Sequence, residues 1–153
     1  MKKLNNKGFS LVELIIVIAI MAILVGVVGT QVIPYLENSR KAKDQQILSA
    51  WNTAAMSAYS NAAAKISATA NYEIIITGTG MTCSGGDGSD SIKNYFSELT
   101  GITAGYNFNS NMESKAGKDI KEVKITIYSS GAMVLVTTNN TPASYHFDDI
   151  ESK

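Results

Sequence analysis

The chain contains 153 residues, and its 13 Lys and Arg residues balance 13 Asp and Glu residues, so it is formally neutral. This length fits one domain plus a membrane anchor, and the charge balance argues against a nucleic-acid surface, which needs a clustered basic excess. Cys83 is the only cysteine, which excludes an intrachain disulfide, so the domain must depend on packing and hydrogen bonds.

The first predicted element is an apolar helix that begins near Phe9. No residue from Leu14 to Val28 is polar, and between Phe9 and Leu14 only Ser10 and Glu13 interrupt the run. About 20 apolar residues in a helix span the roughly 30 Å hydrocarbon core of a bilayer, whereas a secretory signal peptide has a shorter apolar core. The lysines at positions 2, 3 and 7 flank the run on one side only, which predicts that residues 1–8 stay cytoplasmic and the rest lies outside.

Glu13 places an ionisable side chain inside this span. A charge at that depth costs about 2.5–3.5 kcal/mol on insertion scales, so a functional partner is expected. A cation from a second chain would offset the cost, and an α-amino group on Phe9 is such a cation once Met1–Gly8 are removed. Glu13 is therefore expected to be satisfied in a packed fibre and strained in an isolated subunit. The alternative is an ordinary anchor whose carboxyl group is neutral or reaches the headgroups.

The start of this helix resembles the processing site of type IV prepilins and pseudopilins. The residues that carry the resemblance are Lys7-Gly8-Phe9-Ser10-Leu11-Val12-Glu13. This resemblance implies peptidase cleavage between Gly8 and Phe9, methylation of the Phe9 amine, and pairing of Glu13 with a neighbouring N-terminus. It divides the chain into a cleaved leader (1–8), a transmembrane assembly half of a long helix (9–34) and a globular head (35–153) that includes the amphipathic half of that helix. Removal of the leader leaves 10 basic against 13 acidic side chains, a formal charge of −3.

The helix is predicted to continue from Tyr35 to about Ala70, after a bend or a locally melted turn at Gly26–Pro34. Its apolar residues recur at spacings of three and four, as one face of a helix requires. The predicted apolar stripe comprises Ile47, Trp51, Ala54, Ala55, Ala58, Tyr59, Ala62 and Ile66, and the predicted solvent face comprises Arg40, Lys41, Lys43, Asp44 and Gln45.

The remaining elements predict an α+β fold, with the long helix packed against a small C-terminal antiparallel sheet in a pilin-like arrangement. Strands are expected at Tyr72–Ile76, Ile102–Phe108, Val123–Tyr128 (with Val123, Ile125 and Ile127 inward), Ala132–Thr138 and, as an edge, Ser144–Phe147. Thr77–Asp90 is expected to be a long surface loop, and Ser91–Leu99 a helix capped by Asp90 or Ser91 at its start and by Gly101 at its end. Turns are expected at Ser129–Gly131 and Asn139–Pro142.

Little in the sequence points to other chemistry. The Gly-rich stretch 85–93 fits one copy of a calcium-binding nonapeptide, but such sites form between stacked copies. Asp148, Asp149 and Glu151 next to His146 offer oxygen ligands that suit calcium, although an acidic tail is usually only solvated. The sequence lacks a phosphate-binding loop and a Gly-x-Ser-x-Gly elbow. We therefore expect no catalytic residue, no cofactor and no metal.

These observations predict a structural subunit of a type IV pilus filament, used in adhesion, motility or surface attachment. The expected partners are copies of the chain itself in a helical filament, a prepilin peptidase, an assembly ATPase and a membrane platform, with the subunit stored in the cytoplasmic membrane before it reaches the cell surface. The alternatives are a pseudopilin of type II secretion or competence DNA uptake, and a membrane-anchored binding domain that does not polymerise.

Overall fold

The computed structural model describes residues 8–139 and 147–152. The chain divides into two compact units, Met1–Glu37 and Asn38–Lys153. Helix α1 (Leu11–Asn61) contributes to both units.

The first unit is a length of exposed helix. The sequence predicts a bend or a locally melted turn at Gly26–Pro34, but the backbone is helical throughout this range, so the melted turn is wrong for this structure. Pro34 has no N–H to donate to the carbonyl of Thr30. The Thr30 hydroxyl donates to the carbonyl oxygen of Val27 at 3.2 Å, an additional hydrogen bond within the helix one turn before the proline.

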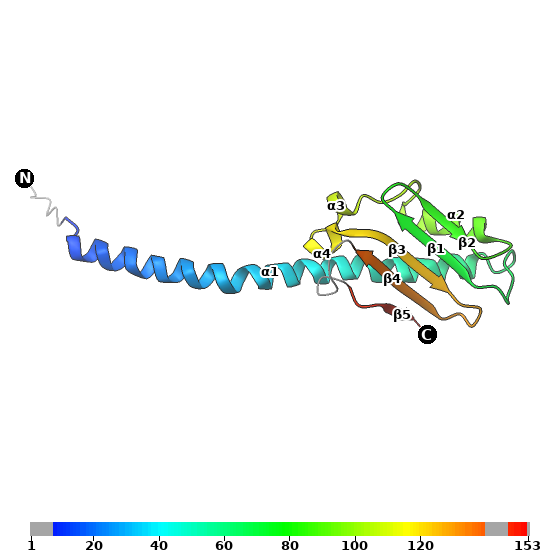
Figure 1. Ribbon diagram of the computed structural model, residues 1–153, viewed down its shortest axis with the longest axis horizontal. Helices are drawn as coiled ribbons and strands as arrows, with labels where there is room; N and C mark the ends of the chain where they lie inside the picture. The colour runs from blue at the N-terminus through cyan, green and yellow to red at the C-terminus, as the bar shows by residue number, and fades with distance from the viewer. Residues whose placement is uncertain (1–7, 140–146, 153) are drawn as a thin grey trace, which may run out of the picture. The chain divides into compact units, whose positions relative to one another are not determined.

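The second unit is a five-stranded antiparallel sheet with helices packed against it (Figure 1). The strand order is β2-β1-β3-β4-β5, for β1 (Tyr72–Thr77), β2 (Met81–Ser84), β3 (Ile120–Ile127), β4 (Met133–Asn139) and β5 (Ile150–Ser152). The short helices are α2 (Ser89–Thr100), α3 (Phe108–Asn111) and α4 (Lys115–Lys118).

The core lies between α1 and one face of the sheet. Leu48, Ala55 and Ala58 of α1 are fully buried, as are the inward residues of the central strands. The predicted inward residues Val123, Ile125 and Ile127 are all 0% exposed, and Ile125 pairs with Ile74 on β1. The alanines of α1 let the helix backbone approach the sheet closely, so the predicted α+β, pilin-like arrangement is confirmed.

Three predicted boundaries are wrong, each because tertiary contacts override local propensity. Helix α1 ends at Asn61, nine residues before Ala70, and the hydroxyl of Tyr72 accepts the Ser67 N–H at 2.9 Å, which ties down the connection. The predicted loop Thr77–Asp90 contains β2, because a tight turn, closed by the Thr77 N–H and the Gly80 carbonyl at 2.8 Å, sends the chain back along β1. The predicted strand Ile102–Phe108 is a loop that leads into α3.

The ends of the short elements also differ from the prediction. Gly88, in a left-handed conformation, is the N-cap of α2 without a side-chain cap, so Asp90 and Ser91 do not cap it. Gly101 ends α2 as predicted, and its N–H donates to the Ser97 carbonyl at 2.8 Å. The predicted turn Asn139–Pro142 and edge strand Ser144–Phe147 fall largely outside the described residues. Strand β5 is an edge strand that the sequence pattern did not reveal.

Candidate functional site

The helix surface of the first unit is apolar and exposed along its whole described length. Every described residue from 8 to 36 is exposed, including Phe9 at 93%. Among the described residues, α1 is the one helix long and apolar enough to cross a membrane. Exposed apolar surface of this extent requires a cover, which lipid or other copies of the helix can provide.

The carboxylate of Glu13 has a partner within its own chain. One of its oxygens, Oε2, accepts the backbone N–H of Ser10 at 2.8 Å. The Ser10 hydroxyl in turn accepts the backbone N–H of Val12 at 3.3 Å. This is a capping box, in which Ser and Glu at a Ser-x-x-Glu spacing satisfy the free N–H groups of a helix start. Glu13 thus has a hydrogen-bond partner within its own chain, and its pairing with the N-terminus of a second chain stays a prediction.

The capping box was readable from the sequence. Ser10-Leu11-Val12-Glu13 directly precedes a long apolar run, which is the pattern that marks a helix start. Gly8 and Phe9 come just before the helix and are exposed, and nothing lies within 4 Å of the place where a Cβ of Gly8 would be. The structure therefore places Gly8, Phe9 and Glu13 together at the start of α1, with the bond between Gly8 and Phe9 outside the helix.

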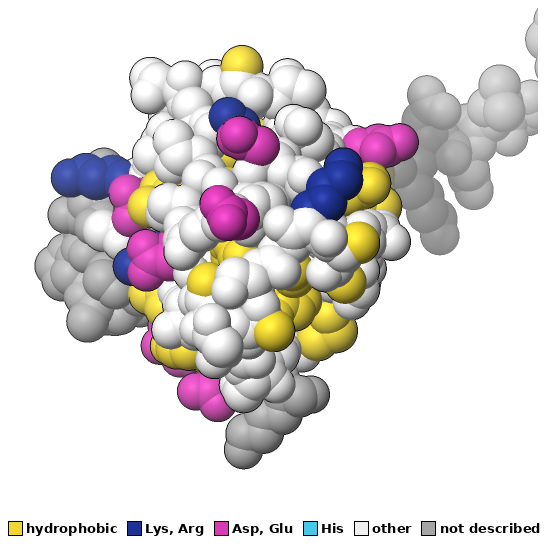
Figure 2. Space-filling model, turned by 90° about the vertical axis from the view of Figure 1, so that its right-hand side faces the viewer, with side chains coloured by type: hydrophobic (Ala, Val, Ile, Leu, Met, Phe, Trp, Pro, Cys, Tyr) yellow, Lys and Arg dark blue, Asp and Glu magenta, His cyan; other side chains and the backbone are white. Residues whose placement is uncertain are grey.

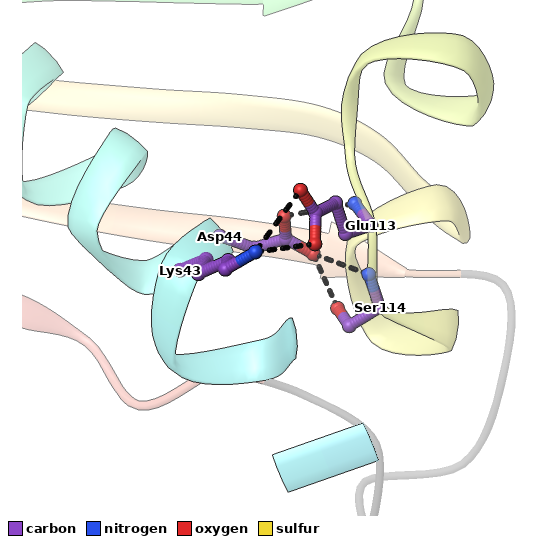
Figure 3. A network of polar contacts seen from close by, with 4 residues as sticks. All are labelled: Lys43, Asp44, Glu113 and Ser114. Atoms are coloured by element: carbon purple, nitrogen blue, oxygen red, sulfur yellow. Dashed lines mark hydrogen bonds and ion pairs between the residues drawn. The ribbon is translucent and has the colours of Figure 1, made fainter. Parts of the chain in front are cut away.

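The second unit holds a second carboxylate of α1, and this one is buried. Asp44 is 0% exposed, although the sequence analysis placed it on the solvent face. Its oxygens accept the backbone N–H groups of Glu113 at 2.9 Å and of Ser114 at 2.8 Å, together with the hydroxyl of Ser114 (Figure 3). The carboxylate thus satisfies three donors, as buried charge requires.

Neighbouring residues complete this contact, which we call the Asp44 clamp (Asp44, Glu113, Ser114 and Gly117). The Ser114 hydroxyl also accepts the Gly117 N–H at 2.9 Å and so caps α4. A Cβ on Gly117 would lie 2.3 Å from an oxygen of Asp44, so only glycine fits there. Beside the clamp, Lys43 and Glu113 form an exposed ion pair at 3.1 Å (Figure 3). The clamp joins α1 to a segment about 70 residues later in the chain.

The other candidate residues are not brought together. Burial, helped by the nearby charge of Asp90 and opposed by that of Lys93, raises the pKa of the Cys83 thiol to about 11, so the thiol is a poor nucleophile at neutral pH. Among the described residues, no group of three His, Cys, Asp or Glu side chains could hold a metal ion. His146 lies outside the described residues. On the face of the second unit that Figure 2 shows, basic side chains are interspersed with acidic ones and form no continuous patch.

Comparison with known proteins adds one finding at the N-terminus. Residues 3–29 match the family described as the prokaryotic N-terminal methylation motif. No curated protein and no solved structure matches the chain. The match covers Gly8, Phe9 and Glu13 and the apolar stretch of α1 that follows them. The chain thus carries, at its N-terminus, the cleavage motif of type IV prepilins and pseudopilins.

Proposed function

We propose that this protein is a structural subunit of a type IV pilus filament. The observation that carries the proposal is the exposed apolar surface of α1, which lies within the matched methylation motif and begins where the Glu13 carboxylate caps the start of the helix. A monomer in water could not keep that surface exposed. Lipid covers it before assembly, and the helices of other copies cover it in the filament.

Processing at the motif would create a positive charge that can pair with the Glu13 carboxylate. Cleavage between Gly8 and Phe9 removes residues 1–8 and leaves an amine on Phe9, which is then methylated. Glu13 already accepts the N–H of Ser10, and Ser10 is the residue next to Phe9, so the new amine arises near the carboxylate. In the packed filament, Glu13 exchanges this local partner for the N-terminus of a neighbouring subunit, because two desolvated opposite charges stabilise each other only in close contact.

The same proposal assigns the parts of the chain. Residues 1–8 are the leader, 9–34 the transmembrane and assembly half of the helix, and 35–153 the head. The subunit waits in the cytoplasmic membrane with its head outside, and an assembly ATPase with a membrane platform extracts it into the surface filament. Within this scheme the protein is a structural component and not an enzyme.

Glu13 variants test the proposal, with the fraction of subunits recovered in sheared filaments as the readout. Glu13→Gln keeps an oxygen that can accept the Ser10 N–H but removes the charge, whereas Glu13→Ala removes both. We expect both variants to be exported and cleaved, and both to lose filaments at least tenfold. Glu98→Gln removes a charge from the exposed surface of the head and should leave filaments intact.

Two results would contradict the proposal. Filaments formed normally by Glu13→Ala would mean that the carboxylate has no part in assembly. Mass spectrometry of the mature chain could also show that it still begins at Met1. The Phe9 amine with which Glu13 is proposed to pair would then not exist. A monomeric anchored binding domain would tolerate Glu13→Ala, and fibres seen only when the gene is overexpressed would favour a pseudopilin.

A further inference from the structure

One surface pocket of the second unit gathers hydrogen-bond donors and positive charge from three distant segments. It has a volume of about 400 Å³ and is lined by Gly78, Thr79, Asn107, Phe108, Asn109, Lys118, Ile120 and Lys121. We call it the lysine pocket. Its volume falls in the range of about 300–1,000 Å³ that is usual for small-ligand sites, and it is much larger than one inorganic anion needs.

The charge of the pocket is unbalanced. Both lysines are exposed, no acidic residue is among the lining residues, and neither lysine forms an ion pair with a residue that the structure describes. The Lys43–Glu113 and Lys124–Glu73 pairs show that other lysines of the same unit do find acidic partners. Two unpaired ammonium groups at one pocket favour a ligand with a negative group.

The neutral side chains of the pocket are suited to hydroxyl groups. Asn107 uses its side-chain oxygen to accept the Ser110 N–H at 3.2 Å, which leaves its NH₂ group to donate. Asn109 offers an amide that can donate and accept, and Thr79 offers a hydroxyl. Neutral donors and acceptors can bind the hydroxyl groups of a sugar, and the positive charge beside them can bind a carboxylate that the sugar carries.

Contacts of neighbouring residues hold the segments that line the pocket in place. The Tyr106 N–H donates to the Thr77 carbonyl at 3.0 Å, and the backbone of Gly105, at φ +123°, lies so close to the Gly80 nitrogen that a Cβ would be 2.7 Å from it. The ring of Phe108, which lines the pocket, meets the ring of Tyr106 edge to face with centroids 5.4 Å apart. A pocket with fixed walls loses little conformational freedom when a ligand binds.

We propose that the lysine pocket binds an acidic saccharide unit, with Lys118 and Lys121 holding the carboxylate and Thr79, Asn107 and Asn109 holding hydroxyl groups. The pocket is complete within one chain, so this inference goes beyond the filament proposal and does not depend on it. The corresponding function is attachment of the subunit to a uronic-acid polysaccharide.

Titration of the full chain in non-ionic detergent micelles tests this proposal, with trigalacturonate as the probe and backbone amide NMR shifts as the readout. We expect saturable shifts at residues 78–79, 107–109 and 118–121. The double variant Lys118→Gln/Lys121→Gln should weaken binding at least tenfold, and Asn109→Ala severalfold. The matched control Lys65→Gln/Lys93→Gln removes the same charge from lysines outside the pocket and should bind as the wild type does.

Four results would overturn the inference. These are absence of saturable shifts at millimolar trigalacturonate, shifts centred elsewhere, equal binding by the Lys118/Lys121 variant, and equal binding of the neutral galactotriose. Inorganic phosphate or an acidic hexapeptide that binds as tightly as trigalacturonate would replace the saccharide by a general anion and overturn the assignment of the ligand. The spectrum of each variant also reports whether it is folded, so a misfolded variant is recognised and replaced by Asn109→Ala.

Discussion

Two carboxylates of the same helix illustrate how surroundings decide the role of a side chain. Glu13 is exposed and accepts one N–H from the residue three positions before it, so its partner is local and exchangeable. Asp44 is buried and accepts three donors from Glu113 and Ser114, so its partners are distant in sequence and fixed by the fold. The first arrangement suits a residue that changes partners, whereas the second suits one that holds two segments together.

Cys83 gives a prediction at the scale of one residue. Because burial raises the pKa of its thiol to about 11 from an ordinary 9.0, little thiolate is present near pH 8. We expect iodoacetamide to react with the folded chain about ten- to a hundredfold more slowly than with the urea-unfolded chain, allowing for the greater reactivity of a more basic thiolate. The unfolded chain is its own control, since Cys83 is the only cysteine.

The same shift predicts the direction of a pH effect on stability. The folded state holds the thiol proton more tightly than the unfolded state, so the protonated thiol adds to the free energy of unfolding. This contribution is complete below about pH 9 and is lost as the pH rises toward 11. Cys83→Ala should flatten the fall in stability over that interval. Equal alkylation rates in the folded and unfolded chains would show that the thiol is not shielded.

At the scale of elements, periodicity predicted most of α1 but not its buried charge. Residues 44, 48, 51, 55, 58 and 62 are all buried and follow spacings of three and four. Asp44 therefore lies on the apolar stripe, and its position was readable from that spacing. Its partners were not, because Glu113 and Ser114 are about 70 residues away and no local pattern links them.

Alternation predicted β3 and β4 well, since one face of each strand is buried and the other is partly or fully exposed. It failed for β2 and for Ile102–Phe108. Four residues with Gly on both sides look like a loop, and β2 exists only because the Thr77–Gly80 turn pairs it with β1. Ile102 and Phe108 are buried, yet the segment between them is a loop and not a strand. Its backbone bonds to β1 through the Tyr106 N–H and the Thr77 carbonyl, at 3.0 Å. The residues proposed for processing and assembly, Gly8, Phe9 and Glu13, could in contrast be predicted from a local pattern, because the motif and the helix start are contiguous.

The Asp44 clamp gives a prediction at the scale of elements. Asp44→Ala leaves the N–H groups of Glu113 and Ser114 and the Ser114 hydroxyl without their acceptor, and it should lower the free energy of unfolding by about 2–4 kcal/mol. Lys43→Gln breaks only the exposed pair with Glu113 and should cost under about 1 kcal/mol. Urea unfolding followed by the fluorescence of Trp51, the only tryptophan and 5% exposed, measures both. An equal effect of the two changes would mean that the buried carboxylate does not hold α4 to α1.

At the scale of the whole molecule, the two units have surfaces of different kinds. The described residues of the first unit before Glu37 are exposed without exception, whereas every buried core residue that the structure describes lies in the second unit, between Leu48 and Phe147. The exposed apolar side chains of the first unit thus need an apolar surrounding, which lipid or other copies of the helix can provide. The second unit contains the interactions that fold it. Under the proposed function, this division would let the subunit leave the membrane for a filament without refolding its head.

This separation predicts that a chain that starts at Asn38 folds by itself into a soluble monomer. Its core and its Asp44 clamp are complete, so thermal unfolding, followed by Trp51 fluorescence, should have a midpoint within a few degrees of that of the full chain in detergent. A chain that starts at Gln45 is the matched control: it loses only seven more residues but lacks Asp44, and it should unfold at least as easily as Asp44→Ala. If the chain from Asn38 shows no cooperative transition, the apolar half of α1 contributes to the fold of the head and the two units are not separable.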